Sequence, residues 1–64
     1  MAHKLTNTEG TNIFVYEPIN TLNVIVTEWL LCPTGWIRID SMQAPIKTAR
    51  GWYKQLLERG YVKA

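Results

Sequence analysis

The sequence predicts an α+β fold, a three-stranded antiparallel β-meander with one C-terminal α-helix packed on one face. Three observations predict it. Two runs rich in β-branched and aromatic residues, 12–19 and 22–32, are separated by turn-forming residues. A Pro-Thr-Gly turn joins the second run to an alternating segment, 35–40. From residue 45 onward, apolar residues recur every three or four positions, as in an amphipathic helix.

The first two predicted strands carry apolar side chains on both faces. In the first, Ile13 and Val15 face one way and Phe14 and Tyr16 the other, and Pro18 ends the strand. The second strand alternates two sets, with Leu22, Val24, Val26 and Leu30 on one face and Ile25, Thr27, Trp29 and Leu31 on the other. One helix covers only one face of a small sheet, so we expect the other face to need a partner.

The turn after residue 32 is the strongest hairpin signal. Pro33 presets φ for the second turn position, and Gly35 supplies the positive φ that a turn followed by a bulge needs. Strict alternation in the third strand then predicts that Ile37 and Ile39 point inward. The opposite face would carry Trp36, Arg38 and Asp40.

A polar connector, residues 41–44, is predicted to lead into the helix, with Pro45 in the first turn, where its missing N–H costs nothing. The helical side chains expected to pack on the sheet are Ala49, Tyr53, Leu56 and Leu57, with Trp52 at the edge of the core. Within the helix, Gly51 costs about 1 kcal/mol relative to alanine, unless a strand or loop lies against it.

The helix end carries a Schellman signature. Gly60 is predicted to adopt the left-handed conformation just past the helix, which places Tyr61 against Leu56 in the last turn. Arg59 would sit near the negative end of the helix dipole.

Length and composition limit the organisation. The 64 residues support one small domain, 11–64, preceded by a flexible tail, 1–10, that pairs only if a neighbouring strand recruits it. The hydrophobic fraction of 47% indicates a folded chain, while only 19% of residues are charged, which suggests that apolar surface meets a partner. Neither a signal peptide nor a membrane span is evident, so we expect a cytoplasmic protein without membrane contact.

Charge is unevenly distributed. Residues 1–44 hold two basic and four acidic side chains, a net charge of −2, whereas residues 45–64 hold five basic and one acidic, a net charge of +4. The overall charge of +2 hides this polarity.

The helix also carries a family resemblance, in the spacing of Ala49, Trp52, Tyr53, Leu56, Leu57, Gly60 and Tyr61. It resembles the C-terminal motif of a family of short, uncharacterised cyanobacterial proteins, in which an alanine precedes a Leu-Trp pair, a leucine and a terminal Gly-Trp. The match covers about a fifth of the chain. It implies no activity, and suggests only a cyanobacterial or cyanophage source.

The sequence argues against an enzyme. General acid/base and nucleophilic sites need several titratable groups that converge, and this chain has few. Asp40 beside Ser41 is best explained as a strand end with a polar turn residue, and Cys32 as a small hydrophobic residue at a strand end. A single histidine, His3, and a single cysteine leave no metal site or disulfide. We therefore expect no catalytic residues, no metal, no cofactor and no small-molecule substrate.

Protein interaction is the favoured function. A chain this small gains from burying about 600 to 800 Å² per partner, and Trp and Tyr often anchor interfaces. We expect a regulatory or interaction module that docks to a partner protein or to itself through the sheet face, with the residues Trp29, Trp36, Arg38 and Tyr16. Alternatively, the tail or a loop folds over the tryptophans and completes a monomeric core.

Nucleic-acid binding is the second hypothesis. Small DNA-binding domains also combine a three-stranded sheet with a C-terminal helix, and here Arg38 would read bases while Lys47, Arg50 and Lys54 contact phosphates. The basic residues lie mostly on the predicted helix rather than on the sheet, which is unfavourable for that docking. We therefore expect Lys47, Arg50 and Lys54 to form an ordinary solvated helix face.

Overall fold

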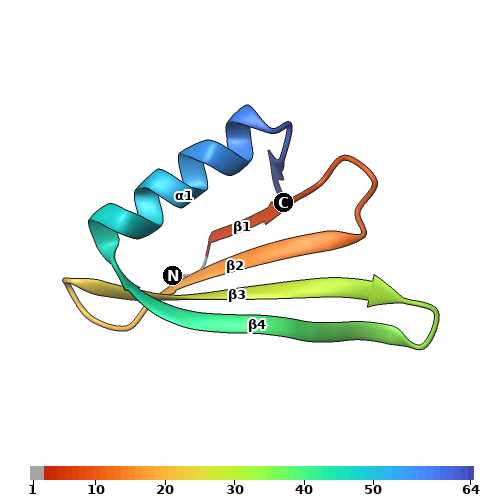
Figure 1. Cartoon of the computed structure of the whole chain (residues 1–64), viewed down its shortest axis with the longest axis horizontal. Coiled ribbons are helices and arrows are strands. Elements are labelled where there is room, and N and C mark those ends of the chain that lie inside the picture. Colours follow the sequence, from red (N-terminus) through yellow and green to blue (C-terminus); the bar gives the residue numbers. More distant parts are fainter. Residues whose placement is uncertain (1–2) are drawn as a thin grey trace.

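The computed structural model describes residues 3–64 and has an α+β architecture, with one antiparallel sheet and one helix (Figure 1). The strands are β1 (His3–Thr6), β2 (Asn12–Pro18), β3 (Asn23–Cys32), β4 (Gly35–Pro45) and β5 (Val62–Lys63), and the helix is α1 (Ile46–Glu58). The order across the sheet is β4-β3-β2-β1-β5. The predicted class is confirmed, but the strand count of three is wrong, because the sheet has five.

The two additional strands come from the chain ends. In the predicted tail, β1 pairs with β2 and places Leu5 opposite Phe14; Leu5 is 0% exposed and belongs to the core. The last strand, β5, pairs with β1 through Thr6 and Val62. Residues 1 and 2 of the predicted tail lie outside the described part of the chain. One buried leucine therefore holds both ends of the described chain in the sheet.

The long hairpin forms at the predicted turn but runs further than expected. Gly35 has φ of 123°, which confirms the positive φ predicted there. Strand β4 then continues through residues 41–44 to Pro45, so the predicted polar connector is part of the sheet. Pro45 is the residue just before the helix rather than its first turn. The chain therefore passes from strand to helix without a loop.

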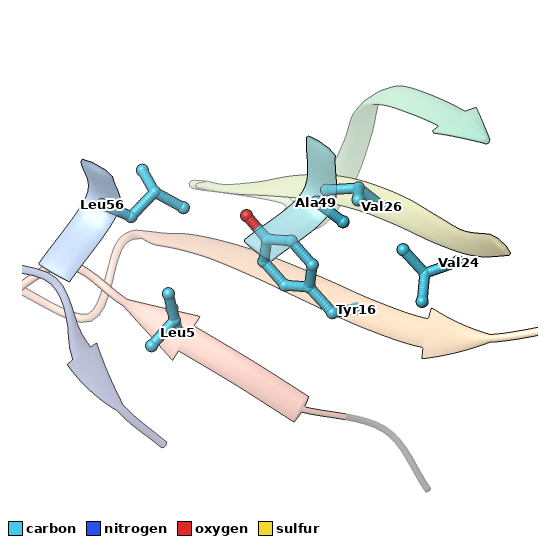
Figure 2. Packing of buried hydrophobic residues seen from close by; sticks show 6 residues of the cluster. All are labelled: Leu5, Tyr16, Val24, Val26, Ala49 and Leu56. Atoms are coloured by element: carbon cyan, nitrogen blue, oxygen red, sulfur yellow. The ribbon is translucent and has the colours of Figure 1, made fainter. Parts of the chain in front are cut away.

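Helix α1 lies on one side of the sheet, which we call the helix face (Figure 1). Figure 2 shows the core beneath it, with buried side chains from β1, β2, β3 and α1. The residues of this cluster are Leu5, Tyr16, Val24, Val26, Ala49 and Leu56. Trp52 and Tyr53 pack against it, as predicted, whereas Leu57 is exposed and does not.

The predicted helix end is confirmed in detail. Gly60 has φ of 99°, the Tyr61 N–H donates to the Leu56 carbonyl at 3.0 Å, and the Gly60 N–H donates to the Leu57 carbonyl at 3.1 Å. These two bonds define a Schellman motif. The motif directs the Tyr61 ring onto Phe14, edge to face, with 5.7 Å between ring centroids.

A β-bulge in β4 overturns the predicted alternation. Glu28 pairs with Asp40 but Trp29 pairs with Arg38, so Ile39 has no partner in the register. The extra residue reverses the faces beyond it. Asp40 consequently lines a helix-face cavity, not the face of Arg38. Neither Ile37 nor Ile39 points into the core as predicted, since both are about half exposed.

Candidate functional site

The side of the sheet opposite α1, which we call the open face, carries the predicted tryptophans. Strand register places Ile13 beside Trp29, Trp29 beside Arg38, and Leu31 beside Trp36. A shallow groove of about 290 Å³ runs between these side chains. Its lining residues are Lys4, Ile13, Val15, Trp29 and Trp36.

The open face is sparsely charged, and its exposed apolar side chains lie toward the hairpin turn. Thr27 on β3 is buried by its neighbours, and its hydroxyl lies 3.4 Å from that of Ser41. Trp36 remains 44% exposed and Leu31 43% exposed, because no described part of the chain folds over them. Three of the four predicted partner-binding residues, Trp29, Trp36 and Arg38, therefore lie on one face.

The fourth residue, Tyr16, is not on this face. It is only 5% exposed, beneath the helix, with its ring 5.4 Å from that of Tyr53 in an edge-to-face arrangement. Burial raises the pKa of the Tyr16 hydroxyl above its ordinary value, and the neighbouring Tyr53 raises it further by a smaller amount. Tyr16 is thus a core residue, and its prediction as a surface anchor is wrong.

The turn end of the β3–β4 hairpin extends past the helix (Figure 1). On this hairpin end, large apolar side chains are exposed on both sides of the sheet. They are Leu30, Leu31, Trp36, Ile37 and Ile39. The helix face of the sheet is therefore also uncovered here, which the sequence did not indicate, because Ile37 and Ile39 were expected in the core.

The basic residues proposed for nucleic-acid binding are split between two sides of the molecule. Lys47, Arg50 and Lys54 are exposed and follow the helical spacing of one stripe on α1. Arg38 lies on the open face, on the other side of the sheet. The four cations therefore do not form one continuous surface.

The remaining sequence candidates do not converge on a reactive centre. The Asp40 carboxylate accepts a hydrogen bond from the Ser41 backbone N–H at 2.9 Å, which is a local turn-like contact. Cys32 is a half-buried free thiol at the end of β3. Within residues 3–64, no three His, Cys, Asp or Glu side chains are grouped so that they could hold a metal ion.

Sequence reasoning missed a buried polar network on the helix face. The Asn12 amide donates to Glu28 Oε2 and to the Trp29 carbonyl, both at 3.0 Å, and its oxygen accepts the Tyr61 hydroxyl. No sequence signal could have found it, because Asn12 and Tyr61 are 49 positions apart. It joins β2, β3 and the helix end.

Comparisons with protein families, curated proteins and solved structures found no match. The cyanobacterial resemblance therefore stays a prediction. The single helix of the described chain, 13 residues long, is too short to traverse a bilayer.

Proposed function

We propose that this chain is a small non-enzymatic interaction module that docks through the open face of its sheet, and that the occupant of this face is a second copy of the chain. One observation carries the proposal. Trp36 and Leu31 are exposed side by side above a groove lined by Ile13, Val15 and Trp29. A sheet face with this composition normally meets another layer.

A second copy of the chain can supply that layer with its own open face. Two like sheets pack face to face about 10 Å apart, with the side chains of the inner faces interdigitating. An isologous interface pairs one patch with itself, so unlike charges within the patch can face each other across the twofold axis. The open face carries such charges, with Lys4 and Arg38 as well as Glu17, which pairs with Ile25.

The charge distribution favours protein over nucleic acid as the occupant. Nucleic acid binding needs cations beside the stacking aromatics, so that phosphates and bases are contacted together. The open face offers Lys4 and Arg38 for this role, while the basic stripe of Lys47, Arg50 and Lys54 belongs to the helix. Apolar contact between two copies requires the tryptophans of the open face but not the basic residues of the helix.

The experiment is light scattering across a concentration series on the wild type and on Trp36→Ala. We expect the wild type to form dimers and the variant to shift to monomer, with about a tenfold weaker association because a central tryptophan is lost. Far-UV circular dichroism should be unchanged, since Trp36 is not a core residue. Leu57→Ala, which removes an exposed apolar side chain from the helix, should dimerise like the wild type.

A gel-shift assay with DNA in low salt distinguishes nucleic-acid binding from dimerisation. A strict monomer that binds DNA with a steep salt dependence would contradict the proposal and favour nucleic-acid recognition. Normal dimerisation by Trp36→Ala would show that the open face is not the interface.

A further inference from the structure

A second cavity lies between α1 and the sheet, on the side of β1 and β5. Its volume is about 330 Å³, at the lower end of the range for small-molecule sites. The residues that line it are His3, Tyr16, Pro18, Val24, Ile46, Ala49, Arg50, Tyr53 and Lys63. They come from five elements that only the folded chain brings together.

The walls of this cavity are apolar and aromatic. Val24 and Ala49 are buried on opposite sides, from the sheet and the helix, and Tyr53 and Ile46 are half-buried beside them. Walls of this kind hold the apolar body of a ligand by excluding water from it.

The two charged side chains that line the cavity, Arg50 and Lys63, are both basic. Lys63 is paired with Leu5, which places it on the helix face, and His3 is paired with Tyr16. Arg50 approaches from the helix. Among the described residues that line the cavity, none is acidic. Convergent cations without a carboxylate create a positive potential that attracts an anion.

Tyr16 contributes an aromatic ring to the wall of the cavity. The Tyr16 hydroxyl is buried and has no hydrogen-bond partner, which is unusual for a polar group in a protein interior. Figure 2 shows it directed from β2 toward the helix. Because this oxygen is shielded from solvent, the hydroxyl does not reach a ligand at the rim of the cavity.

Tyr16 also borders a neighbouring cavity of about 260 Å³ toward the end of the helix. That cavity is lined by the carboxylates of Glu28 and Asp40 as well as by Arg59, so an anion is disfavoured there. The charge of the lining thus assigns anion binding to the cavity of Arg50 and Lys63.

We infer that the cavity beside Arg50 binds a small organic carboxylate with a flat apolar body. The apolar body lies between Val24, Ala49 and Tyr53, and the carboxylate meets the cations at the rim. The inference is independent of the open face, which lies on the other side of the sheet. It assigns a small-molecule ligand to a chain whose sequence predicted none.

The test is a titration of the isotope-labelled full chain with naphthalene-2-carboxylate, followed by nuclear magnetic resonance. We expect saturable shifts in the signals of Val24, Ala49 and Tyr53. The neutral analogue naphthalene-2-carboxamide should bind about tenfold more weakly, because it lacks the charge that the rim recognises. Equal binding of the two compounds, or shifts confined to Trp29 and Trp36, would overturn the inference.

Variants locate the contacts. Arg50→Gln should weaken carboxylate binding about tenfold and leave carboxamide binding unchanged. Tyr16→Phe keeps the aromatic ring in the cavity wall and should bind the carboxylate like the wild type. Lys47→Gln removes the same charge from an exposed helix position outside the cavity and should bind like the wild type. If Arg50→Gln and Lys47→Gln bind the carboxylate equally well, the cavity is not the site.

Discussion

Asn12 shows how one buried polar residue holds distant parts of this chain together. Its amide group uses both donors and its acceptor, on Glu28, Trp29 and Tyr61. Because every polar atom is satisfied, the network does not incur the usual cost of buried polar groups. Asn12 therefore fixes the end of the helix relative to β2 and β3, although the sequence indicated only that it begins the first predicted strand run.

Asn12→Ala should lower the free energy of unfolding by about 2 to 3 kcal/mol, since it leaves the Tyr61 hydroxyl and the Trp29 carbonyl without their partner. Tyr61→Phe should cost about 1 kcal/mol, because it removes a single bond. Urea unfolding of both variants and the double variant measures the coupling between them. Strictly additive effects would show that the two side chains do not interact.

Tyr16 has the opposite property, a buried hydroxyl without a partner. Tyr16→Phe should leave the free energy of unfolding unchanged or raise it by up to about 1 kcal/mol, because an unsatisfied polar group is removed. Tyr53→Phe, beside it and half-buried, is the matched control. Urea unfolding of ligand-free protein distinguishes them, and a loss above about 1 kcal/mol for Tyr16→Phe would reveal a hidden hydrogen bond.

Tyr16 should also make the free energy of unfolding depend on pH. The pKa of Tyr16 is raised in the folded protein above its ordinary value of 10.0, so the folded state holds the proton more tightly than the unfolded state. The resulting stability is complete below pH 10 and is lost as pH rises through the folded pKa. Unfolding measured from about pH 9 to 12 should show this decline in the wild type, and a smaller decline in Tyr16→Phe. Identical profiles for the two proteins would contradict the assignment.

The helix was predictable because its signals are local, namely the spacing of apolar residues, Pro45 before its start and Gly60 after its end. Of the two explanations considered for Gly51, a close approach of a strand or loop does not hold, since a Cβ added there meets nothing within 4 Å. Gly51 is therefore an ordinary helical position with an unfavourable residue.

Gly51→Ala should raise the free energy of unfolding by about 0.5 to 1 kcal/mol, because alanine is the better helix former. Gly60→Ala should lower it by about 1 kcal/mol or more, because Gly60 has a φ that alanine rarely adopts. Thermal unfolding of both variants under one condition checks the contrast. A destabilised Gly51→Ala would show that something does lie against the helix there.

The strands were less predictable, for physical reasons. Residues 3–6 contain one apolar side chain, Leu5, and β5 has two residues, so neither segment shows an alternating pattern. Both form because β1 pairs with β2 and β5 with β1, which are contacts between distant parts of the chain. The bulge at Ile39 could not be predicted either, because apolar and polar residues continue to alternate through it in the sequence.

In the molecule as a whole, helix α1 covers one face of the sheet and leaves the open face uncovered. The sequence correctly indicated that Trp29, Trp36 and Arg38 share a face, because all three lie on the side of the bulge near the hairpin turn. It could not indicate that Tyr16 and Asp40 face the helix, since that depends on which face the helix covers and on the bulge. The cavity between α1 and the sheet also escaped prediction, because its lining residues His3, Arg50 and Lys63 come together only when β1 and β5 join the sheet.

The three tryptophans provide the most direct measurement of the central claim, that the open face is where the chain associates. Trp29 and Trp36 line the open-face groove, whereas Trp52 packs on the helix side of the sheet. We predict that the indole N–H resonances of Trp29 and Trp36 shift on dilution while that of Trp52 stays in place. Concentration-independent signals from all three tryptophans, or a shift of Trp52 alone, would contradict the account.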